Sequence, residues 1–357
     1  MIERLGSSGS GNREVAFHIS IPVKNLMEFL PSCLFSVLSS ATQARVHIHV
    51  RLDSSSIEEL GFISSAQEII DKLPNFTLSR SAGVDSNVAH ALQVSLSSVS
   101  ELESDGYRVF LGWLGADDLL QSAALDNLLE ILTDYPEIRF LGGRRSVVTE
   151  KGVLMQLDNS PLYSQYDLAT GQADSNSKPF LQAEGVFFDH DLLIEAGGFN
   201  TNLRLAFDYD LWVRIARLEP YSNVDALVGT WRRRSGQLSA ATASYLSEIE
   251  SAKVAHKKDL SRGKLASGLS REIRLIKRHA GEERFRLGEW QEPEVPALLD
   301  IHAEHLRDVA EAIISGSSLT SQSALDLLLL AQRIRPEGPV IRRMIQELKA
   351  IEASGPR

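Results

Sequence analysis

The sequence predicts an α/β protein whose core is a sheet with parallel strands. Residues 17–23 (FHISIPV) alternate apolar and polar side chains, which is the pattern of a strand. A helical pattern over 25–40 and a second alternating strand at 46–52 follow. Strand, helix and strand in this order make a parallel pair joined by a crossover helix. The nearly continuous apolar run at 107–114 (YRVFLGWL) is typical of a central strand that is covered on both faces.

The same alternation of strands and helices continues to about residue 240. A weaker strand at 76–81 precedes a helix over 88–96, and either Asp85 or Ser86 is its predicted N-cap. Later helices are predicted from apolar spacing or a closing glycine, and later strands from alternation and turn signals. The predicted helices are 125–132, 191–199 and 208–218; the predicted strands lie in 138–157 (strand, turn, strand), 180–188 and 223–231.

Composition divides the chain into three parts. Residues 1–16 carry charges and small side chains without an apolar core, which predicts a flexible leader rather than a signal peptide. Residues 17–239 hold the α/β pattern. Residues 240–357 show helical spacing and no predicted strands, so we expect a helical C-terminal domain whose last two helices meet at RPEGP, 335–339.

The overall composition excludes several classes of protein. The 357 residues are 43% hydrophobic and 24% charged, as in globular proteins, and the net charge of −10 disfavours a nucleic-acid binder. Cys33 is the single cysteine, which excludes disulfides within the chain, and its helical apolar neighbours predict a core position. No run reaches the ~18–20 apolar residues that span a bilayer. We expect a soluble cytoplasmic protein, and peripheral attachment to the inner face of a membrane stays open.

Acidic residues follow three of the predicted strands. Asp53 and Asp85 each come after a strand, and Asp117 and Asp118 follow the central apolar run as neighbours. In an open α/β sheet, ligands bind beyond the carboxyl ends of the strands. A carboxylate pair is favourable there when Mg²⁺ or Mn²⁺ lies between it and a diphosphate. The alternative is that the pair caps the next helix and opposes its dipole.

A set of ordered segments over about 17–239 resembles the family-2 glycosyltransferases of GT-A fold. The segments are ISIPVKN, FLPSCLFSVLSS, VRLDSSS, AGVDSNVAHAL, FLGWLGADDLL, EAGGFN, DYDLWVRIA and WRRRSGQLS. The resemblance implies a Rossmann-like mixed sheet flanked by helices, here with a C-terminal helical extension. It also implies transfer of a sugar from a nucleotide-diphosphate donor to the hydroxyl of a sugar, glycan or glycolipid. The reaction of the family is a single displacement with inversion, assisted by Mn²⁺ or Mg²⁺.

The resemblance also implies roles for single residues. The implied donor contacts are Pro22, Asp53, Asp85, Ala116, Asp117 and Arg234, and the implied metal ligands are Asp117 and Asp118. Asp53 would accept a hydrogen bond from the nucleotide base, or else be a turn residue; Asp85 would contact the nucleotide or cap a helix.

Two positions depart from the pattern of the family. Gly115 stands where some members carry another aspartate, and Arg234 stands where members often carry a histidine. Arginine does not ligate metals but can neutralise a departing diphosphate through two hydrogen bonds. Metal binding could therefore be partly replaced by Arg234.

On the acceptor side, the resemblance implies that Asp208 is the general base. Such a base works best with a raised pKa, which partial burial produces. The alternative is an acidic first helical turn that favours the helix dipole. For Asp210 we favour a structural ion pair with Arg214, one helical turn later.

Several other residues have a structural interpretation. Trp113 could stack on a sugar, but its place in an apolar strand favours core packing. We interpret His47 and His49 as part of a polar sheet face rather than as a pair of metal ligands. We interpret residues 189–191 (DHD) as a helix cap. The polar stretch 158–180 has no period, and we expect a loop that closes over the donor.

Two other functions remain open. A non-catalytic relative would bind a nucleotide sugar or a partner protein without turnover, as Gly115 and the absent histidine suggest. A nucleotidyltransferase is disfavoured, because SIPVKN at the first strand lacks the glycines of a phosphate-binding loop. The C-terminal helices could contact a membrane, a partner or a second subunit.

Overall fold

A computed structural model describes most of the chain. Described are residues 13–53, 57–96, 99–104, 106–157, 162–174, 179–237, 242–262, 268–278, 282–290, 307, 324–325, 328–329, 331–332 and 339–353. The chain falls into two compact units, residues 1–290 and 291–357. Most of the predicted leader, 1–16, lies outside the described residues, and the first strand begins at Val15.

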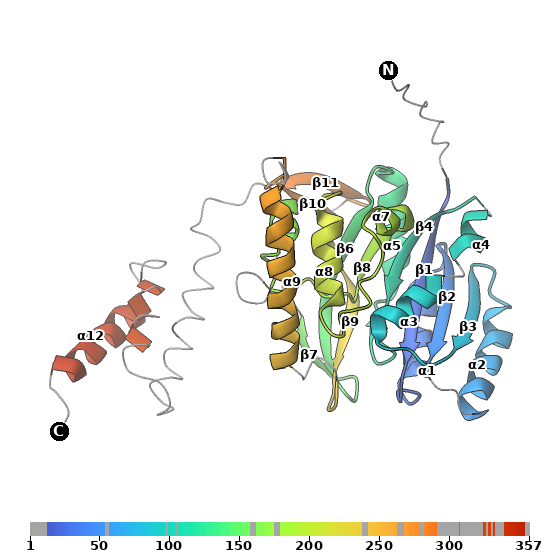
Figure 1. The fold of residues 1–357 in the computed structure, drawn as a ribbon, viewed down its shortest axis with the longest axis horizontal. Coiled ribbons are helices and arrows are strands. Elements are labelled where there is room, and N and C mark those ends of the chain that lie inside the picture. Colours follow the sequence, from blue (N-terminus) through green and yellow to red (C-terminus); the bar gives the residue numbers. More distant parts are fainter. Residues whose placement is uncertain are drawn as a thin grey trace, which may run out of the picture. The chain divides into compact units, whose positions relative to one another are not determined.

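The first unit is built on one mixed sheet of eleven strands in its described part, ordered β11-β10-β9-β6-β8-β4-β1-β2-β3, with β5 beside β9 and β7 beside β6 (Figure 1). The strands are β1 (Val15–Val23), β2 (Arg45–Leu52), β3 (Phe76–Ala82), β4 (Arg108–Trp113), β5 (Leu119–Leu120), β6 (Phe140–Thr149), β7 (Leu154–Leu157), β8 (Val186–Asp189), β9 (Ser222–Arg233), β10 (Ile273–Arg278) and β11 (Phe285–Trp290). The helices are α1 (Leu30–Ser39), α2 (Ile57–Ile70), α3 (Val88–Ser95), α4 (Val99–Ser104), α5 (Ala124–Asp134), α6 (Gln165–Ala169), α7 (His190–Glu195), α8 (Phe207–Ala216), α9 (Thr242–Arg262) and, in the second unit, α12 (Pro339–Ala353).

The strand directions bring most carboxyl ends to one edge of the sheet. β1 pairs in parallel with β2 and β4, and β2 with β3. β8 is antiparallel to both β4 and β6, so β6 runs in the same direction as β4, and β9 runs parallel to β6. The carboxyl ends of β1, β2, β3, β4, β6 and β9 therefore share an edge. The predicted mixed α/β sheet flanked by helices is confirmed.

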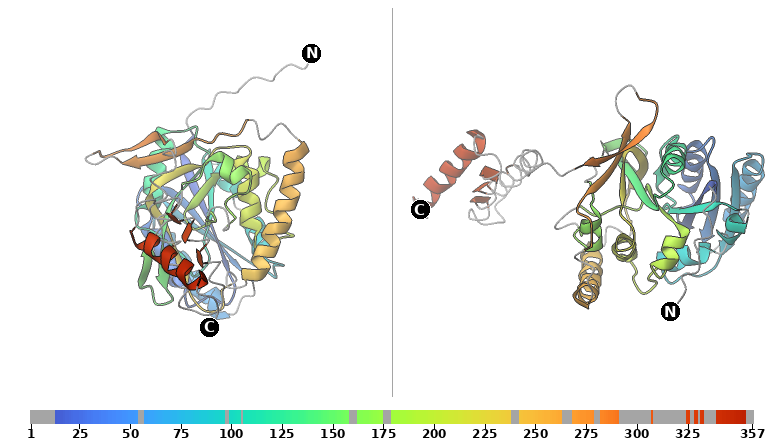
Figure 2. Two further views of the ribbon diagram at one scale, coloured as in Figure 1. Left: turned by 90° about the vertical axis from the view of Figure 1, so that its left-hand side faces the viewer. Right: turned by 90° about the horizontal axis from the view of Figure 1, so that it is seen from above.

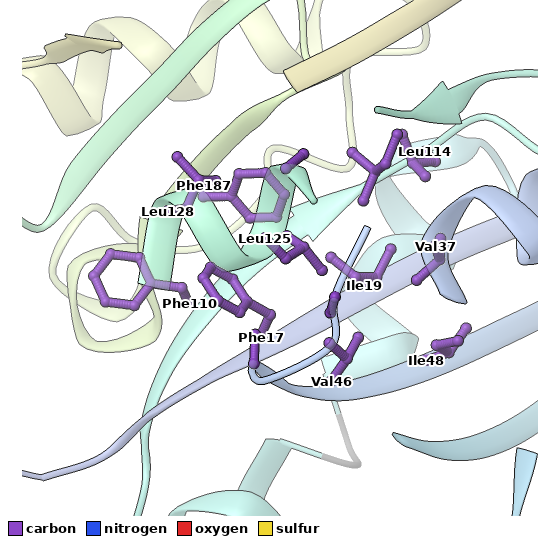
Figure 3. Close-up of a cluster of buried hydrophobic side chains, with 14 of the residues drawn as sticks. Phe17, Ile19, Val37, Val46, Ile48, Phe110, Leu114, Leu125, Leu128 and Phe187 are labelled. Atoms are coloured by element: carbon purple, nitrogen blue, oxygen red, sulfur yellow. The ribbon is translucent and has the colours of Figure 1, made fainter. Parts of the chain in front are cut away.

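Alternation along the strands divides the core into two layers. Phe17, Ile19 and Ile48 face a first cluster, in which α1, α2 and α5 pack on the sheet. Figure 3 shows Phe17 and Ile19 near Leu125 of α5, and Ile48 on the side of Val37 of α1. The other face of the sheet packs against α3, α4 and α6 to α9. Figures 1 and 2 show α9 beside α8 on this side of the sheet. Cys33 is fully buried in the first cluster, as predicted.

A row of polar side chains is buried on the second face of the sheet. His47 donates or accepts hydrogen bonds at 2.8 Å from Thr77 and 2.7 Å from Ser79, and His49 bonds Ser79 at 2.8 Å. The ring of His18 stacks on that of His47 with centroids 5.3 Å apart. The predicted polar sheet face is thus present, and it is buried rather than exposed.

This row predicts a specific dependence of stability on pH. Burial lowers the pKa of both His47 and His49 to about 4, so both stay neutral in the folded protein while an unfolded histidine takes up a proton below its usual pKa of 6.5. Their contribution is therefore fully present above pH 6.5 and is lost as the pH falls towards 4, by up to about 3 kcal/mol for each residue. Urea unfolding between pH 4.5 and 7.5 measures this, and the double variant His47→Gln/His49→Gln should show a flatter profile. Equal slopes for both proteins would contradict it.

Several predicted elements are corrected by the structure. The extension after residue 240 is not all helical, because β10 and β11 form a hairpin that adds to the sheet edge beside β9. The compact units divide at 290, not near 240. The strand predicted at 180–188 is reduced to β8, since Gly185 adopts φ +93° and interrupts it. α3 is capped by Asn87, whose side chain accepts from the His90 amide, and not by Asp85 or Ser86.

Among the other local predictions, the cap at Asp189 agrees with the structure, and the stretch 158–180 lies partly outside the described residues. Asp189 caps α7 by accepting from the Asp191 amide. The stretch 158–180 holds the short helix α6, and 158–161 and 175–178 lie outside the described residues. In the second unit, buried side chains of α12, such as Ile341 and Met344, pack with Leu325 and Leu328. In the described part of the chain, no helix is both long enough and apolar enough to cross a membrane.

Candidate functional site

A cleft of about 790 Å³ opens at the edge where the carboxyl ends of the strands meet. Of the residues predicted from the sequence, those that line it are Pro22, Asp53, Asp85, Asp117, Asp118, Asp208 and Arg234. Ala116 does not line the cleft, since its side chain is fully buried. The fold thus brings together side chains from β1, from α8 and from the segments that follow β2, β3, β4 and β9.

The two neighbouring aspartates point to a common place. The amide of Asp118 donates to the Gly115 carbonyl at 2.9 Å, which closes a tight turn. One oxygen of Asp117 and one of Asp118 each lie 2.7 Å from the position that a Cβ on Gly115 would occupy. A side chain at 115 would collide with both. The carboxylates therefore converge beside the glycine.

The end of β9 holds this pair in place. The backbone amide of Arg232 donates to Asp118 at 2.9 Å, and the Arg234 guanidinium donates to Asp117 at 2.6 Å. Gln237 adds a weaker hydrogen bond to the same Asp117 oxygen at 3.3 Å. The helix that follows, α5, has Ala123 at its N-cap and no side-chain cap. The alternative that the aspartates cap this helix is therefore wrong.

The cleft penalises negative charge on Asp118. Burial raises the pKa of Asp118 well above its usual value, and the nearby charges of Glu184 and Asp117 raise it further. Glu184 has a raised pKa too, because it is buried, although Arg145 works in the opposite direction. A positive ion placed among these carboxylates would remove the penalty.

The predicted nucleotide contacts are already paired with cations. Lys24 lies 2.8 Å from Asp53, and this hydrogen bond is the main reason that the pKa of Asp53 is lowered. Asp85 accepts two hydrogen bonds from Arg51, at 2.8 and 3.0 Å, and one from His90 at 2.8 Å. Burial works to raise the pKa of Asp85, but these bonds outweigh it and leave the pKa below its usual value.

Asp208 has the opposite electrostatic environment. It lies in the first turn of α8, where its carboxylate accepts from the Tyr209 amide at 2.8 Å. Burial raises the pKa of Asp208 to about 7, and the charges of Glu184 and Glu248 add to the rise. Glu248, from α9, also accepts hydrogen bonds from the amides of Leu205 and Ala206 at 2.8 and 3.0 Å. It therefore fixes the chain just before Asp208.

Asp210 and Trp113 have structural roles, as expected. Asp210 accepts from Arg214 at 2.9 Å and lies 3.1 Å from His256. Trp113 is only 8% exposed and stacks on Trp212 with ring centroids 5.3 Å apart. Trp113 also lines the cleft.

Sequence reasoning missed several residues of the cleft. Arg145, Glu184 and Tyr245 line it without belonging to any motif that we recognised, and Tyr245 lies beyond the predicted domain boundary. Arg51 also lines it, and the period-two spacing from His47 and His49 could have placed it on the polar face.

Comparison with known proteins finds distant likenesses only. No family model matches the sequence, and no curated protein matches it. Among solved structures, S. aureus TarS 1–349 is similar at 11% identity and TM-score 0.46, over 95% of this chain and 92% of that one. A mannosyltransferase, PcManGT from Pyrobaculum calidifontis, in complex with GDP-Man and Mn²⁺, is similar at 16% identity and TM-score 0.46, over 95% and 85% of the two chains. GalNAc-T7 with UDP, GalNAc and Mn²⁺ is similar at 12% identity and TM-score 0.45. That match covers 67% of this chain and 48% of the GalNAc-T7 chain.

We predict that truncating Arg51, which forms a buried ion pair with Asp85, destabilises the protein strongly. Arg51→Ala leaves the Asp85 carboxylate buried without its strongest partner, so we expect a loss of about 3–5 kcal/mol in the free energy of unfolding. Arg139→Ala is the control, because Arg139 pairs with the half-exposed Glu195 and should cost about 1 kcal/mol or less. Chemical denaturation measures both variants, and a loss no greater for Arg51→Ala than for Arg139→Ala would contradict the expectation.

Proposed function

We propose that this protein transfers a sugar from a nucleotide-diphosphate donor to a hydroxyl-bearing acceptor, with inversion, by a single displacement. One observation carries the proposal: a carboxyl group with a pKa raised to about 7, Asp208, opens onto the same cleft as the converging Asp117 and Asp118 and the cation Arg234. The resemblance of the ordered sequence segments to family-2 glycosyltransferases supports it. The acceptor class that we propose is a sugar, a glycan or a glycolipid.

The donor would lie along the carboxyl ends of β1, β2 and β4. Pro22 and Asp53 line this part of the cleft and would border the base, with Asp53 accepting a hydrogen bond. Asp85 has its carboxylate held by Arg51, so we assign it the task of fixing that wall rather than of contacting the nucleotide directly. The diphosphate would then reach Asp117 and Arg234.

The two aspartates fit a divalent cation. Their oxygens converge beside Gly115, and Asp118 is buried close to two other carboxylates. Asp117 and Asp118 would hold Mn²⁺ or Mg²⁺, which when bound supplies positive charge to the departing diphosphate. Among the described residues, a group of three close metal-ligating side chains occurs at Glu103, His190 and Asp191, none of which lines the cleft. The cleft thus offers two protein ligands and leaves the others to water and phosphate.

Arg234 would change partners during binding. It now donates to Asp117 at 2.6 Å. When a diphosphate enters, the guanidinium can turn from the carboxylate to the phosphate oxygens, which suit its two parallel donors. Arg234 would then neutralise the diphosphate as it departs.

Asp208 would remove the proton of the acceptor. As the acceptor oxygen forms its bond to the anomeric carbon, the bond from that carbon to the diphosphate breaks and the diphosphate keeps the electron pair. The hydroxyl proton passes to the Asp208 carboxylate. A pKa of about 7 makes Asp208 an effective base near neutral pH, because it is both partly ionised and strong enough to accept the proton.

A second candidate function is nucleotide-sugar binding without turnover. The contact between Arg234 and Asp117 favours it, since the arginine stands where a metal ligand is expected in the resembled family. It predicts that nucleotides bind and that no sugar is transferred or hydrolysed with any divalent metal.

Nucleotide binding should depend on Asp117 and on a divalent cation. We expect a thermal shift with one or more of UDP, GDP, ADP and CDP in the presence of Mn²⁺, and its loss in Asp117→Ala. Asp71→Ala on the surface is the control, since Asp71 contacts only the exposed Gln67 among the hydrogen bonds described. A shift that survives in Asp117→Ala at equal Mn²⁺ would refute the metal role.

Asp208→Asn should separate catalysis from binding. The amide keeps an oxygen for the Tyr209 N–H but cannot accept the acceptor proton, so we expect turnover to fall about 10²–10⁴-fold while nucleotide binding is retained. In the wild type, the rate should decline as the pH falls below about 7, because Asp208 becomes protonated. An unchanged rate in Asp208→Asn, or a profile that is flat from pH 5 to 8, would exclude Asp208 as the base.

A further inference from the structure

A second cavity of about 490 Å³ lies next to the cleft. Its floor is formed by β6 and β9, with Leu275 from β10. The pairing of β6 with β9 shifts register here: Gly143 pairs with Val224, but the next residue, Arg144, pairs with Leu227. β9 therefore carries two extra residues at this step, one of which is Asp225, and a third before Gly229, which pairs with Arg145.

The two cavities share a wall. Phe180, Gln182 and Glu184, from the segment before β8, line both of them, and Arg145 of β6 does too. On the side of the cleft, Phe180 makes an edge contact with Tyr245, with ring centroids 5.8 Å apart, and both rings line the same cleft as Asp208. The second cavity therefore adjoins the part of the cleft that Phe180 and Tyr245 line.

The lining of the second cavity is polar but electrically balanced. Arg144 lies 3.1 Å from Asp225 at the rim, and Arg145 lies 3.6 Å from Glu184 on the shared wall. With each arginine beside a carboxylate, the lining does not favour a phosphate or a cation. Leu162, Pro179 and Leu181 add apolar surface to the lining. Apolar patches with paired donors and acceptors suit a neutral ligand that has both C–H faces and hydroxyl groups.

We propose that the second cavity is a binding subsite for an uncharged oligosaccharide acceptor. The terminal sugar would lie against Phe180 and Tyr245 beside Asp208, and the next sugar would occupy the second cavity, within reach of Arg144 and Asp225. This inference rests on the proposed function and adds to it the class of acceptor: a glycan of two or more neutral sugars. Monosaccharides would reach only the cleft.

A glycan array with the full-length protein tests the inference, using neutral and anionic glycans from one to six sugars. The variant is Arg144→Ala, since the Arg144 side chain is 42% exposed and lies outside the proposed catalytic machinery. Arg278→Ala is the matched control: its side chain is 41% exposed, is paired with Glu130, and lines neither cavity. We expect the wild type and Arg278→Ala to bind neutral glycans of two or more sugars, and Arg144→Ala to bind them about tenfold more weakly.

Three outcomes would overturn the subsite: no neutral glycan longer than one sugar is bound, Arg144→Ala binds like Arg278→Ala, or anionic glycans are preferred. Thermal shifts of the same three proteins with UDP and GDP plus Mn²⁺ distinguish failure of the subsite from failure of the proposed transfer reaction. Nucleotide binding without glycan binding removes the subsite and keeps the proposed function. Glycan binding that depends on Arg144, without any nucleotide binding, keeps the subsite as a carbohydrate site and removes the transfer reaction.

Discussion

The site depends on two carboxylates, Asp117 and Asp118, that are kept almost out of water at the end of a central strand. Such a pair is costly unless its charge is balanced. Part of this balance comes from the end of β9, where the Arg234 guanidinium reaches Asp117 and a backbone amide reaches Asp118, whose pKa still stays raised. Because β9 runs parallel to β6, its end arrives at the same edge as the end of β4. The topology of the sheet thus positions the charge that the aspartates need.

The carboxyl groups of the cleft have different pKa values because their surroundings differ. At the β2 and β3 side, arginine and lysine partners lower the pKa values of Asp85 and Asp53, which remain ionised. At the α8 side, burial raises the pKa of Asp208 to about 7. Opposite shifts within one cleft are the arrangement by which an enzyme assigns fixed charge and proton transfer to different groups. Glu248 of α9 contributes to the raised pKa of Asp208, because it adds negative charge nearby. It also holds the chain before Asp208 through two backbone amides.

The sequence predicted the centre of the sheet and the aspartates of the cleft, since buried strands carry strong periodic signals and most of these acidic residues follow their ends. It did not predict β10 and β11, because these strands at the edge of the sheet carry several charges, as in IRLIKR, without a regular alternation of apolar and polar residues. Tyr245 and Glu248 were missed because α9 packs on the rest of the protein through only a few side chains. The sequence of such a helix cannot be told from that of a helix exposed to solvent. Ala116 was placed in the site by resemblance, whereas the tight turn at Gly115 buries it. Asn87 replaced Asp85 as the cap because Arg51 holds the Asp85 carboxylate.

We propose that Asp117 and Asp118 hold a divalent cation against a diphosphate. Pulsed electron paramagnetic resonance of Mn²⁺ with the protein and a nucleoside diphosphate measures this contact directly through the coupling between the ion and phosphorus nuclei. We expect a bound Mn²⁺ signal with phosphorus coupling in the wild type, and loss of the signal in Asp117→Asn/Asp118→Asn. Bound Mn²⁺ without phosphorus coupling, or an identical spectrum in the double variant, would contradict it.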